Sequence, residues 1–423
     1  MKRAIFILLL LTAIILKSGA QQAVGHIEAL INRSDWFALD EICSKKQDKL
    51  PSTMQEYLSE VMWNTHFNRP DVAINYLDTL LTYHQEELGL DNVYNLIALK
   101  SHLYADQGLY REASENSTHF LDQLAAFNMS KDNFPAHVFL EKYYGEIAFV
   151  PKPEVIRPAY DVEIPFSTEN NETGKFIYVP VSIHGKTYRF IFNAGAGFTF
   201  ISEQLAQEMN IYLTDGSVGI KNVKGSLGKS GVVDSMQIGD ITLKNIIVFV
   251  GKSGEEIDPA LQVDAILGLD FLRLMGEMQL LPEKKVIVFP AHKTGFPKTG
   301  RNLMIDNNRL YLKGYSGKER LVFRLDAGNM DVSLHFPYYE KNKVMIESKS
   351  LKSGISAEKA GVYQLPQIAL KIGKKKFKRK NVPVFTQRLS ELQQEEEGAL
   401  GMDFFLRFKA VTLNTNQMFV EIK

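Results

Sequence analysis

Cysteine is almost missing from this sequence of 423 residues: Cys43 is the only one, so no internal disulfide can form. An excess of charge of one sign is also missing, because 49 Lys and Arg residues balance 49 Asp and Glu residues. Zero net charge gives the chain no general attraction to nucleic acid or anionic membranes. The nine histidines show no metal-ligand spacing, and neither HExxH nor GxSxG occurs. We therefore expect no metal, no other cofactor and no nucleic acid partner.

Long hydrophobic runs are missing after the first 20 residues. Lys2 and Arg3 are basic, residues 4–16 contain only Thr12 as a polar residue, and residues 18–20 are small. This order is typical of a signal peptide, residues 1–20, cleaved after Ala20. The apolar run is shorter than the roughly 20 residues of a membrane-spanning helix, although an uncleaved anchor is the alternative. We expect an exported protein, periplasmic or extracellular, without a transmembrane segment after cleavage. Export without disulfides favours a bacterial source.

Residues 21–148 have the apolar spacing of helices, with Ile74, Leu77 and Leu81 as an example. Similar segments open at residues 34, 68 and 107, and their alanines, at positions 38, 73 and 113, lie 35 and 40 residues apart. This period resembles degenerate tetratricopeptide-type repeats. Such a domain would bind a protein partner, and the alternative is a packed helical cap.

Residues 149–174 contain four prolines, which predict a linker (Pro151, Pro153, Pro158 and Pro165). The apolar period then changes from helical to two. Residues 176–183 are predicted to be a strand, residues 184–186 a turn and residues 188–192 the returning strand. The rest of the chain continues as short strands and turns.

This β region repeats itself. Residues 190–195 read Phe-Ile-Phe-Asn-Ala-Gly, and residues 323–328 read Phe-Arg-Leu-Asp-Ala-Gly. Residues 265–272 are similarly echoed by residues 398–405. Asn193 and Asp326 are 133 positions apart, and so are Gly268 and Gly401. A motif and an interval that both recur indicate an internal duplication, with one lobe at 175–296 and the second at 297–423.

The four segments resemble those of retropepsin-like aspartic proteases, in the exported bacterial form with two lobes in line. The resemblance covers about residues 175–423. It implies a multidomain α+β protein, in which the helical-hairpin domain precedes an all-β bilobal domain of the pepsin type. It also implies a site that binds peptide or unfolded protein, formed by two loops and the segments that brace them. By position these residues are Asn193, Ala194 and Gly195 in lobe 1, Asp326, Ala327 and Gly328 in lobe 2, and the bracing Gly268 and Gly401.

The chemistry of that family needs two carboxyls that share one proton. Asn193 is an amide and cannot ionise, so one of the two is missing. Ala194 and Ala327 replace residues whose hydroxyls, in the family, bond across the axis between the lobes. One interpretation is an aspartic peptidase homologue with impaired or relict activity. The alternative is a non-catalytic protein that binds peptides or acts as a scaffold.

Two further stretches are open to more than one interpretation. Residues 224–231 and 349–361 lie where the family has β-hairpin flaps, but both could be ordinary exposed hairpins. Residues 371–380 contain seven basic residues, which predict either a solvated hairpin or a contact for an acidic surface. Residues 395–397, three glutamates, could neutralise this run.

Overall fold

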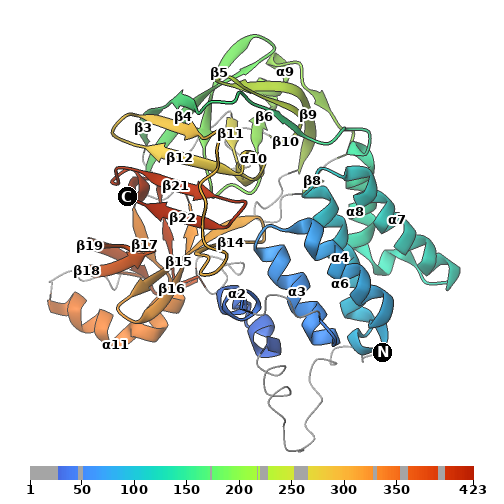
Figure 1. Cartoon of the computed structure of the whole chain (residues 1–423), viewed down its shortest axis with the longest axis horizontal. Helices are drawn as coiled ribbons and strands as arrows, with labels where there is room; N and C mark the ends of the chain where they lie inside the picture. Colours follow the sequence, from blue (N-terminus) through green and yellow to red (C-terminus); the bar gives the residue numbers. More distant parts are fainter. Residues whose placement is uncertain are drawn as a thin grey trace, which may run out of the picture. The chain divides into compact units, whose positions relative to one another are not determined.

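The computed structural model describes residues 27–45, 51–171, 174–216, 218–219, 227–251, 265–326, 331–352, 361–388 and 396–423. The chain divides into two compact units, Met1–Phe149 and Val150–Lys423 (Figure 1). The expected signal peptide lies outside the described residues. No helix among the described residues has both the length and the apolar character to cross a membrane.

The first unit is helical, as the three- and four-residue spacing predicted. Its elements are α2 (Trp36–Cys43), α3 (Met54–His66), α4 (Pro70–Tyr83), α5 (Gln85–Leu88), α6 (Leu90–Ala105), α7 (Tyr110–Ala126), η1 (Lys131–Asn133) and α8 (Pro135–Ile147). Neighbours along the chain pack together: α3 on α4, α4 on α6, α6 on α7, and α7 on α8. The helices α2, α4 and α7 begin within the three similar segments. Ala73 and Ala113 are fully buried, so small residues allow close helix packing there.

Lobe 1 of the second unit is built around a closed ring of six strands. The ring runs β10-β6-β11-β5-β4-β9 and returns to β10. Its strands are β4 (Gly174–Ile183), β5 (Lys186–Phe192), β6 (Phe200–Ser202), β9 (Leu227–Ile238), β10 (Ile241–Gly251) and β11 (Ala265–Leu267). Helix α9 (Glu203–Glu208) follows β6, α10 (Leu269–Met275) follows β11, and β7 (Tyr212–Leu213) and β8 (Val218–Gly219) pair with β9. A ring without free edges is a β-barrel.

Lobe 2 repeats this ring as β15-β16-β20-β17-β19-β18, closed by a pairing of β18 with β15. Its elements are β14 (Leu303–Asp306), β15 (Arg309–Ser316), β16 (Glu319–Leu325), β17 (Val332–Leu334), α11 (Phe336–Lys352), β18 (Val362–Ile372), β19 (Lys375–Phe385), β20 (Gly398–Leu400) and α12 (Met402–Phe405). The predicted fold class, a helical domain followed by a bilobal pepsin-like domain, is thus confirmed.

The internal duplication is visible in the strand register. In lobe 1, Ile191 lies beside Ile266 in a parallel pair, and in lobe 2 Arg324 lies beside Ala399. Arg324 comes 133 positions after Ile191, and Ala399 comes 133 positions after Ile266. We call two such residues equivalent. Equivalent backbones therefore adopt the same pairing although their side chains differ.

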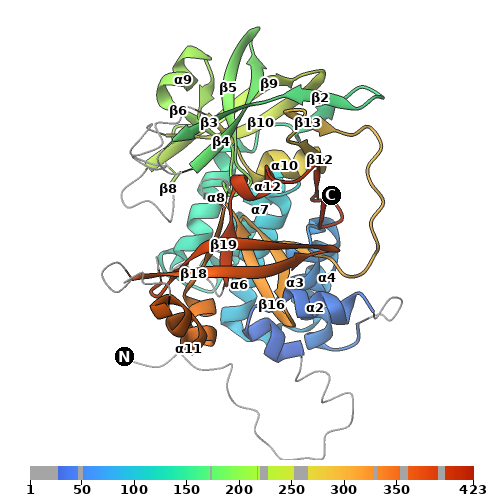
Figure 2. The same cartoon turned by 90° about the vertical axis from the view of Figure 1, so that its left-hand side faces the viewer.

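A third sheet joins the two lobes. It has the order β2-β13-β12-β21-β22, from β2 (Val162–Pro165), β12 (Glu277–Leu281), β13 (Val286–Phe289), β21 (Val411–Asn414) and β22 (Phe419–Ile422). Lobe 1 supplies β12 and lobe 2 supplies β21, which pair directly. Met278 pairs with Leu413, and Leu280 pairs with Val411. Because 278 is equivalent to 411 and 280 to 413, the axis relating the lobes passes between these two pairs. Figure 1 shows β12 and β21 side by side, and Figure 2 shows the strands of lobe 1 above those of lobe 2.

The prediction of a linker at 149–174 was wrong for much of that segment. It contributes β1 (Glu154–Ile156), β2 and β3 (Ser167–Asn171), which pair with β10, β13 and β4. The reason lies in β2, where Val162 and Ile164 are buried while Glu163 and Pro165 are exposed. A proline is compatible with an edge strand, where a missing N–H breaks no ladder.

The expected hairpin at 349–361 also needs a correction. Residues 349–352 are the last residues of helix α11, and residues 353–360 lie outside the described residues. In lobe 1, residues 227–231 belong to β9, which pairs with β8, β7 and β10. Most of the tip of that hairpin, residues 220–226, lies outside the described residues.

Candidate functional site

The first loop of the candidate site leaves the barrel at the end of β5. The Asn193 N–H donates to Leu267 O at 3.0 Å, which fixes the start of the loop against β11. The Asn193 side-chain Oδ1 accepts a hydrogen bond from the Gly195 N–H at 2.8 Å. An amide oxygen can accept this bond as a carboxylate can, but an amide cannot take up or give up the proton. Asn193 therefore keeps the structural part of an aspartate's role without the acid–base part.

The second loop leaves β16 in the same way. The Asp326 N–H donates to Leu400 O at 2.9 Å, which is the equivalent of the bond from Asn193 to Leu267. The Gly401 N–H donates to Asp331 O at 2.7 Å and so ties the bracing segment to the far end of the loop. Three residues of interest, Ala327, Gly328 and Asn329, lie outside the described residues.

The two loops meet at Gly195. A Cβ placed on this glycine would lie 2.8 Å from Leu325 O and 2.9 Å from Asp326 Cα. The same atom would lie 3.1 Å from the Asn193 Oδ1. Contacts below about 3.0 Å leave no space for a side chain, so the approach of the loops requires glycine here. The structure thus brings the loop of Asn193 into contact with the loop of Asp326.

Gly268, in the bracing segment of lobe 1, has an equally close contact. A Cβ on it would lie 2.4 Å from Phe198 C, in the backbone that leads into β6. Beside it, Asp270 accepts bonds from the Thr199 N–H and the Thr199 hydroxyl, both at 2.8 Å. Burial raises the pKa of the Asp270 carboxyl above its usual range, although these bonds oppose the shift. The brace of lobe 1 is therefore a buried carboxylate held by its neighbours.

Asp326 has a charged neighbour that the sequence motifs did not reveal. The Arg324 Nη2 lies 3.0 Å from the Asp326 Oδ2. Both residues lie on one face of the chain because they are two positions apart on a strand. On its other side, Arg324 Nε lies 3.6 Å from Glu396 Oε1. A clue was present in the sequence, since the equivalent of Arg324 in the otherwise apolar first motif is Ile191.

Glu396 belongs to a buried chain of polar groups that has the order of a catalytic triad. The Ser333 Oγ lies 3.3 Å from His335 Nε2, and His335 Nδ1 lies 3.2 Å from Glu396 Oε1. In a hydrolase the serine of such a chain attacks a substrate carbonyl. Here the three residues are only 6%, 1% and 2% exposed, so a substrate cannot reach the hydroxyl. We assign this chain a structural role, in which it holds the charge of Glu396 next to Arg324.

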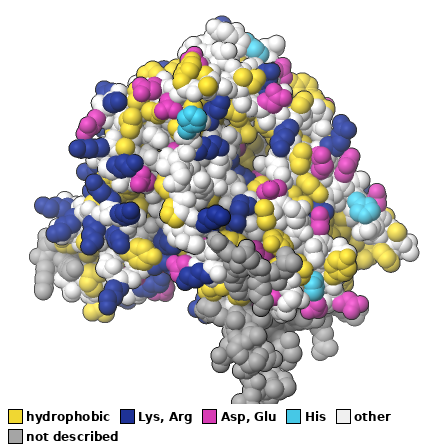
Figure 3. All heavy atoms as spheres, viewed as in Figure 1, with side chains coloured by type: hydrophobic (Ala, Val, Ile, Leu, Met, Phe, Trp, Pro, Cys, Tyr) yellow, Lys and Arg dark blue, Asp and Glu magenta, His cyan; other side chains and the backbone are white. Residues whose placement is uncertain are grey.

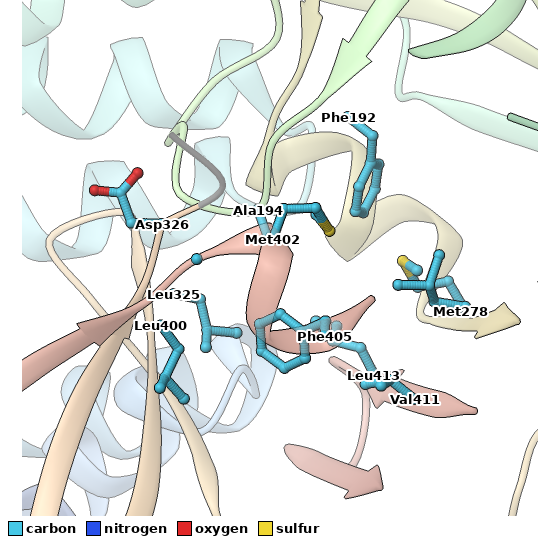
Figure 4. A pocket seen from close by; sticks show the side chains of 12 residues that line it. Phe192, Ala194, Met278, Leu325, Asp326, Leu400, Met402, Phe405, Val411 and Leu413 are labelled. Atoms are coloured by element: carbon cyan, nitrogen blue, oxygen red, sulfur yellow. The ribbon is translucent and has the colours of Figure 1, made fainter. Parts of the chain in front are cut away.

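An apolar pocket lies beneath the loops (Figure 4). It is lined by Phe192, Ala194, Met278, Leu280, Leu325, Asp326, Leu400, Gly401, Met402, Phe405, Val411 and Leu413. Figure 4 shows the Asp326 carboxylate directed away from the apolar side chains of the lining. Ala194 stands at the edge of this pocket where the protease family has a hydroxyl. A hydroxyl added at position 194 would therefore have mainly apolar neighbours in this pocket.

Comparison with known proteins supports the assignment of the first lobe. Residues 179–271 match the family model described as "Aspartyl protease". The chain is similar to the crystal structure of basic 7S globulin from soybean, with a TM-score of 0.43 and 10% identity over 63% of this chain and 95% of that chain. For conglutin gamma, a basic 7S globulin from lupine seeds, the TM-score is 0.38 and the identity 8%, over 62% and 95% of the two chains. Comparison with curated proteins gave no match. Lobe 1 thus contains an aspartyl protease domain of the retropepsin-like type, as its motifs predicted.

Proposed function

We propose that residues 150–423 form an aspartyl-protease-like domain that binds polypeptide without cleaving it by the two-carboxylate reaction. The observation that carries this proposal is the pair of groups on the two loops. One loop has the amide of Asn193, and the other has the Asp326 carboxylate paired with Arg324 at 3.0 Å.

The two-carboxylate reaction needs one ionised and one protonated carboxyl at the same place. The ionised carboxyl takes a proton from water, and the protonated one polarises the peptide carbonyl. Asn193 can do neither. Asp326 could accept a proton, but one of its oxygens already bonds a guanidinium, which draws the carboxylate into an ion pair. The site therefore lacks both the shared proton and a free base.

The frame around the site supports binding. The main-chain bonds of Asn193 and Asp326 are the same in both lobes, and the sheet between the lobes is continuous. The strands and main-chain bonds that would hold a peptide are therefore intact, although the pair of carboxyls that would cleave it is missing. The ligand class, an extended peptide or unfolded protein, comes from the resemblance to the protease family.

A cleavage assay tests the first half of the proposal. Purified protein is incubated with denatured protein substrate across acidic and neutral pH, beside an Asp326→Asn variant. We expect no cleavage by either protein. Cleavage by the wild type that is lost in Asp326→Asn, and blocked by a pepstatin-type inhibitor, would show an active peptidase and overturn the proposal.

A binding screen tests the second half. Fluorescent peptides of random sequence are titrated with the protein and followed by anisotropy, with Gly195→Val as the matched variant. Gly195→Val pushes the two loops apart, so we expect it to weaken binding at least tenfold if the peptide lies at the loops. A peptide that binds wild type and variant equally would place binding elsewhere.

We also propose that the mature protein begins at Gln21, is exported to the periplasm or the extracellular space, and uses its helical unit to bind a protein partner. The sequence of residues 1–20 supports export, and the order of packed helices supports a partner surface. N-terminal sequencing of the protein purified from its natural host checks the first point. A mature chain that still carries residues 1–20 would favour the anchor instead.

A further inference from the structure

The basic run at residues 371–380 folds into the turn end of the β18–β19 hairpin. The exposed face of this hairpin has a defined register. Lys371 lies opposite Lys376, Ala369 opposite Lys378, and Gln367 opposite Lys380. Like charges directly opposite one another destabilise a pair of strands. The pair of Lys371 and Lys376 is therefore a cost to folding that packing does not explain.

All six lysines of the run are exposed: Lys371, Lys374, Lys375, Lys376, Lys378 and Lys380. Within the part of the chain that the structure describes, none of the six makes an ion pair. Arg379 differs from them. It lies 3.3 Å from Asp331, and its guanidinium lies over the ring of Phe377 at 5.0 Å. Arg379 therefore serves the fold. Lys371, Lys376, Lys378 and Lys380 share one exposed face of the hairpin, whereas Lys375 lies opposite the buried Ile372 and Lys374 lies in the turn. We call the four lysines on the shared face the lysine face.

Of the glutamates at 395–397, the two described ones, Glu396 and Glu397, do not neutralise the lysine face, and Glu395 lies outside the described residues. Glu396 is buried beside Arg324 and His335. Glu397 is paired with Lys341 at 2.6 Å and accepts the Val322 N–H at 2.7 Å. The positive charge of the lysine face therefore receives no counter-charge from Glu396 or Glu397. Figure 3 shows Lys and Arg side chains gathered on the side of the molecule where Figure 1 places β18 and β19.

The lysine face lacks the features of a protein interface. Such interfaces are rich in aromatic residues and poor in lysine at their centre. None of the large hydrophobic residues that are exposed in the described chain lies in this hairpin. Single-stranded nucleic acid would need exposed aromatic rings on which bases stack. A repeating row of ammonium groups, about 7 Å apart along a strand, suits a surface that carries many negative charges and no fixed shape.

We propose that the lysine face binds the surface of a bilayer that contains anionic phospholipid. Clusters of four to eight basic residues are typical of such binding, and each lysine contributes to it. The attraction acts over about 10 Å at ordinary salt concentrations, so it needs no insertion into the bilayer. This proposal is independent of the proposed function of the two loops.

Co-sedimentation with vesicles tests the proposal. Mature protein is mixed with vesicles of phosphatidylglycerol in phosphatidylcholine, and with phosphatidylcholine alone. We expect binding to the anionic vesicles only, and a loss of binding as salt is raised. Replacing Lys376, Lys378 and Lys380 by Gln should reduce the partition coefficient about 100-fold, as expected for three lysines at an anionic surface.

A matched variant removes three exposed lysines from elsewhere in the same unit, namely Lys284, Lys293 and Lys298, replaced by Gln. It has the same net charge as the hairpin variant and should bind nearly as wild type. Equal losses in both variants would show that only net charge matters and would overturn the proposal. So would binding of the wild type to neutral vesicles, or failure to bind anionic ones. Retention of heparin without retention of vesicles would assign the lysine face to a soluble polyanion instead.

Discussion

The two lobes have the same ring of six strands and different chemistry at equivalent positions. In lobe 1, Phe176, Ile191 and Phe200 pack together as part of an apolar cluster. Their equivalents in lobe 2 are Arg309, Arg324 and Ser333. Main-chain bonds at both loops are nevertheless alike. The comparison teaches that the loop geometry is set by backbone hydrogen bonds and glycines, and that the side chains were free to diverge.

The two loops differ both in whether they carry a carboxyl and in the polarity of the side chains around it. Lobe 1 lost its carboxyl and kept apolar surroundings. Lobe 2 kept its carboxyl, at Asp326, and surrounded it with the charges of Arg324 and Glu396. Neither lobe on its own, nor the two together, offers a pair of carboxyls that share a proton. The proposal that this domain binds polypeptide without cleaving it rests on this missing pair.

The largest effect is expected from breaking the frame of lobe 1. Gly268→Ala should lower the free energy of unfolding by about 3 kcal/mol, because the new methyl group meets backbone that cannot move aside. Gly295→Ala is the control, since a Cβ there has nothing within 4 Å. Denaturant unfolding measures both. If the two variants were equally stable, side chains rather than glycines would set the loop geometry.

An effect of similar size should come from the charges of lobe 2. Glu396→Ala leaves Arg324 and His335 without their buried carboxylate, and should cost about 3 kcal/mol. The double variant with Arg324→Ile should cost less than the sum of the two single changes, since both remove one interaction. Glu340→Ala, at an exposed site, should change stability by less than about 0.5 kcal/mol. Strict additivity would show that Arg324 and Glu396 do not interact.

A smaller effect separates two equivalent aspartates. Asp270→Asn should cost about 2 kcal/mol, because the buried carboxylate accepts bonds from Thr199. Its equivalent, Asp403, is 29% exposed and 3.9 Å from Lys175, so Asp403→Asn should change stability by less than about 0.5 kcal/mol. Thermal unfolding of the two variants checks this. Equal costs would mean that the brace is the same in both lobes.

The pH dependence of the unfolding free energy, compared between the wild type and Asp270→Asn, gives a second check. The pKa of Asp270 is raised in the folded protein by burial. The folded state therefore holds this proton more tightly than the unfolded state, in which the pKa is about 3.9. As pH rises from that value through the raised pKa, the unfolding free energy of the wild type should fall relative to that of Asp270→Asn. A rise over this range would contradict the assigned direction.

The smallest effect concerns the missing hydroxyls. Ala194→Val adds apolar atoms beside the pocket and should change stability by less than about 1 kcal/mol. Ala194→Thr has nearly the same shape but places a hydroxyl near apolar side chains. It should be about 1 kcal/mol less stable than the Val variant. Equal stability would show that the hydroxyl finds a partner across the axis and that the lock between the lobes can be rebuilt.

The sequence predicted what is local and repeated. The strands around Asn193 and Asp326 follow from the period of two, and the two lobes follow from the interval of 133 positions. The contact between Arg324 and Glu396 could not be predicted, because Glu396 reaches Arg324 only when β20 lies beside β16. Prolines such as Pro165 concealed a strand, since an edge position tolerates them.

Side chains that act far from their sequence neighbours were the other source of error. Glu396 and Glu397 seemed placed to neutralise the lysines of the hairpin, yet both are turned to other partners. Residues 349–352 were expected in a hairpin because of their place between two motifs, and they end a helix. The backbones of the two lobes differ here, since residues 218–219, the equivalents of residues 351–352, form strand β8.

One repair experiment tests the central claim most directly. Asn193→Asp restores the second carboxyl, and Arg324→Ile introduces the residue of lobe 1 and removes the competing cation. Peptidase activity is measured for the wild type, both single variants and the double variant, with Asp326→Asn added to the double as a control. We expect cleavage only from the double variant, at acidic pH, and its loss in the control. Cleavage by the wild type or by Arg324→Ile alone would contradict the claim that Asn193 and Arg324 together keep this site from acting as a protease.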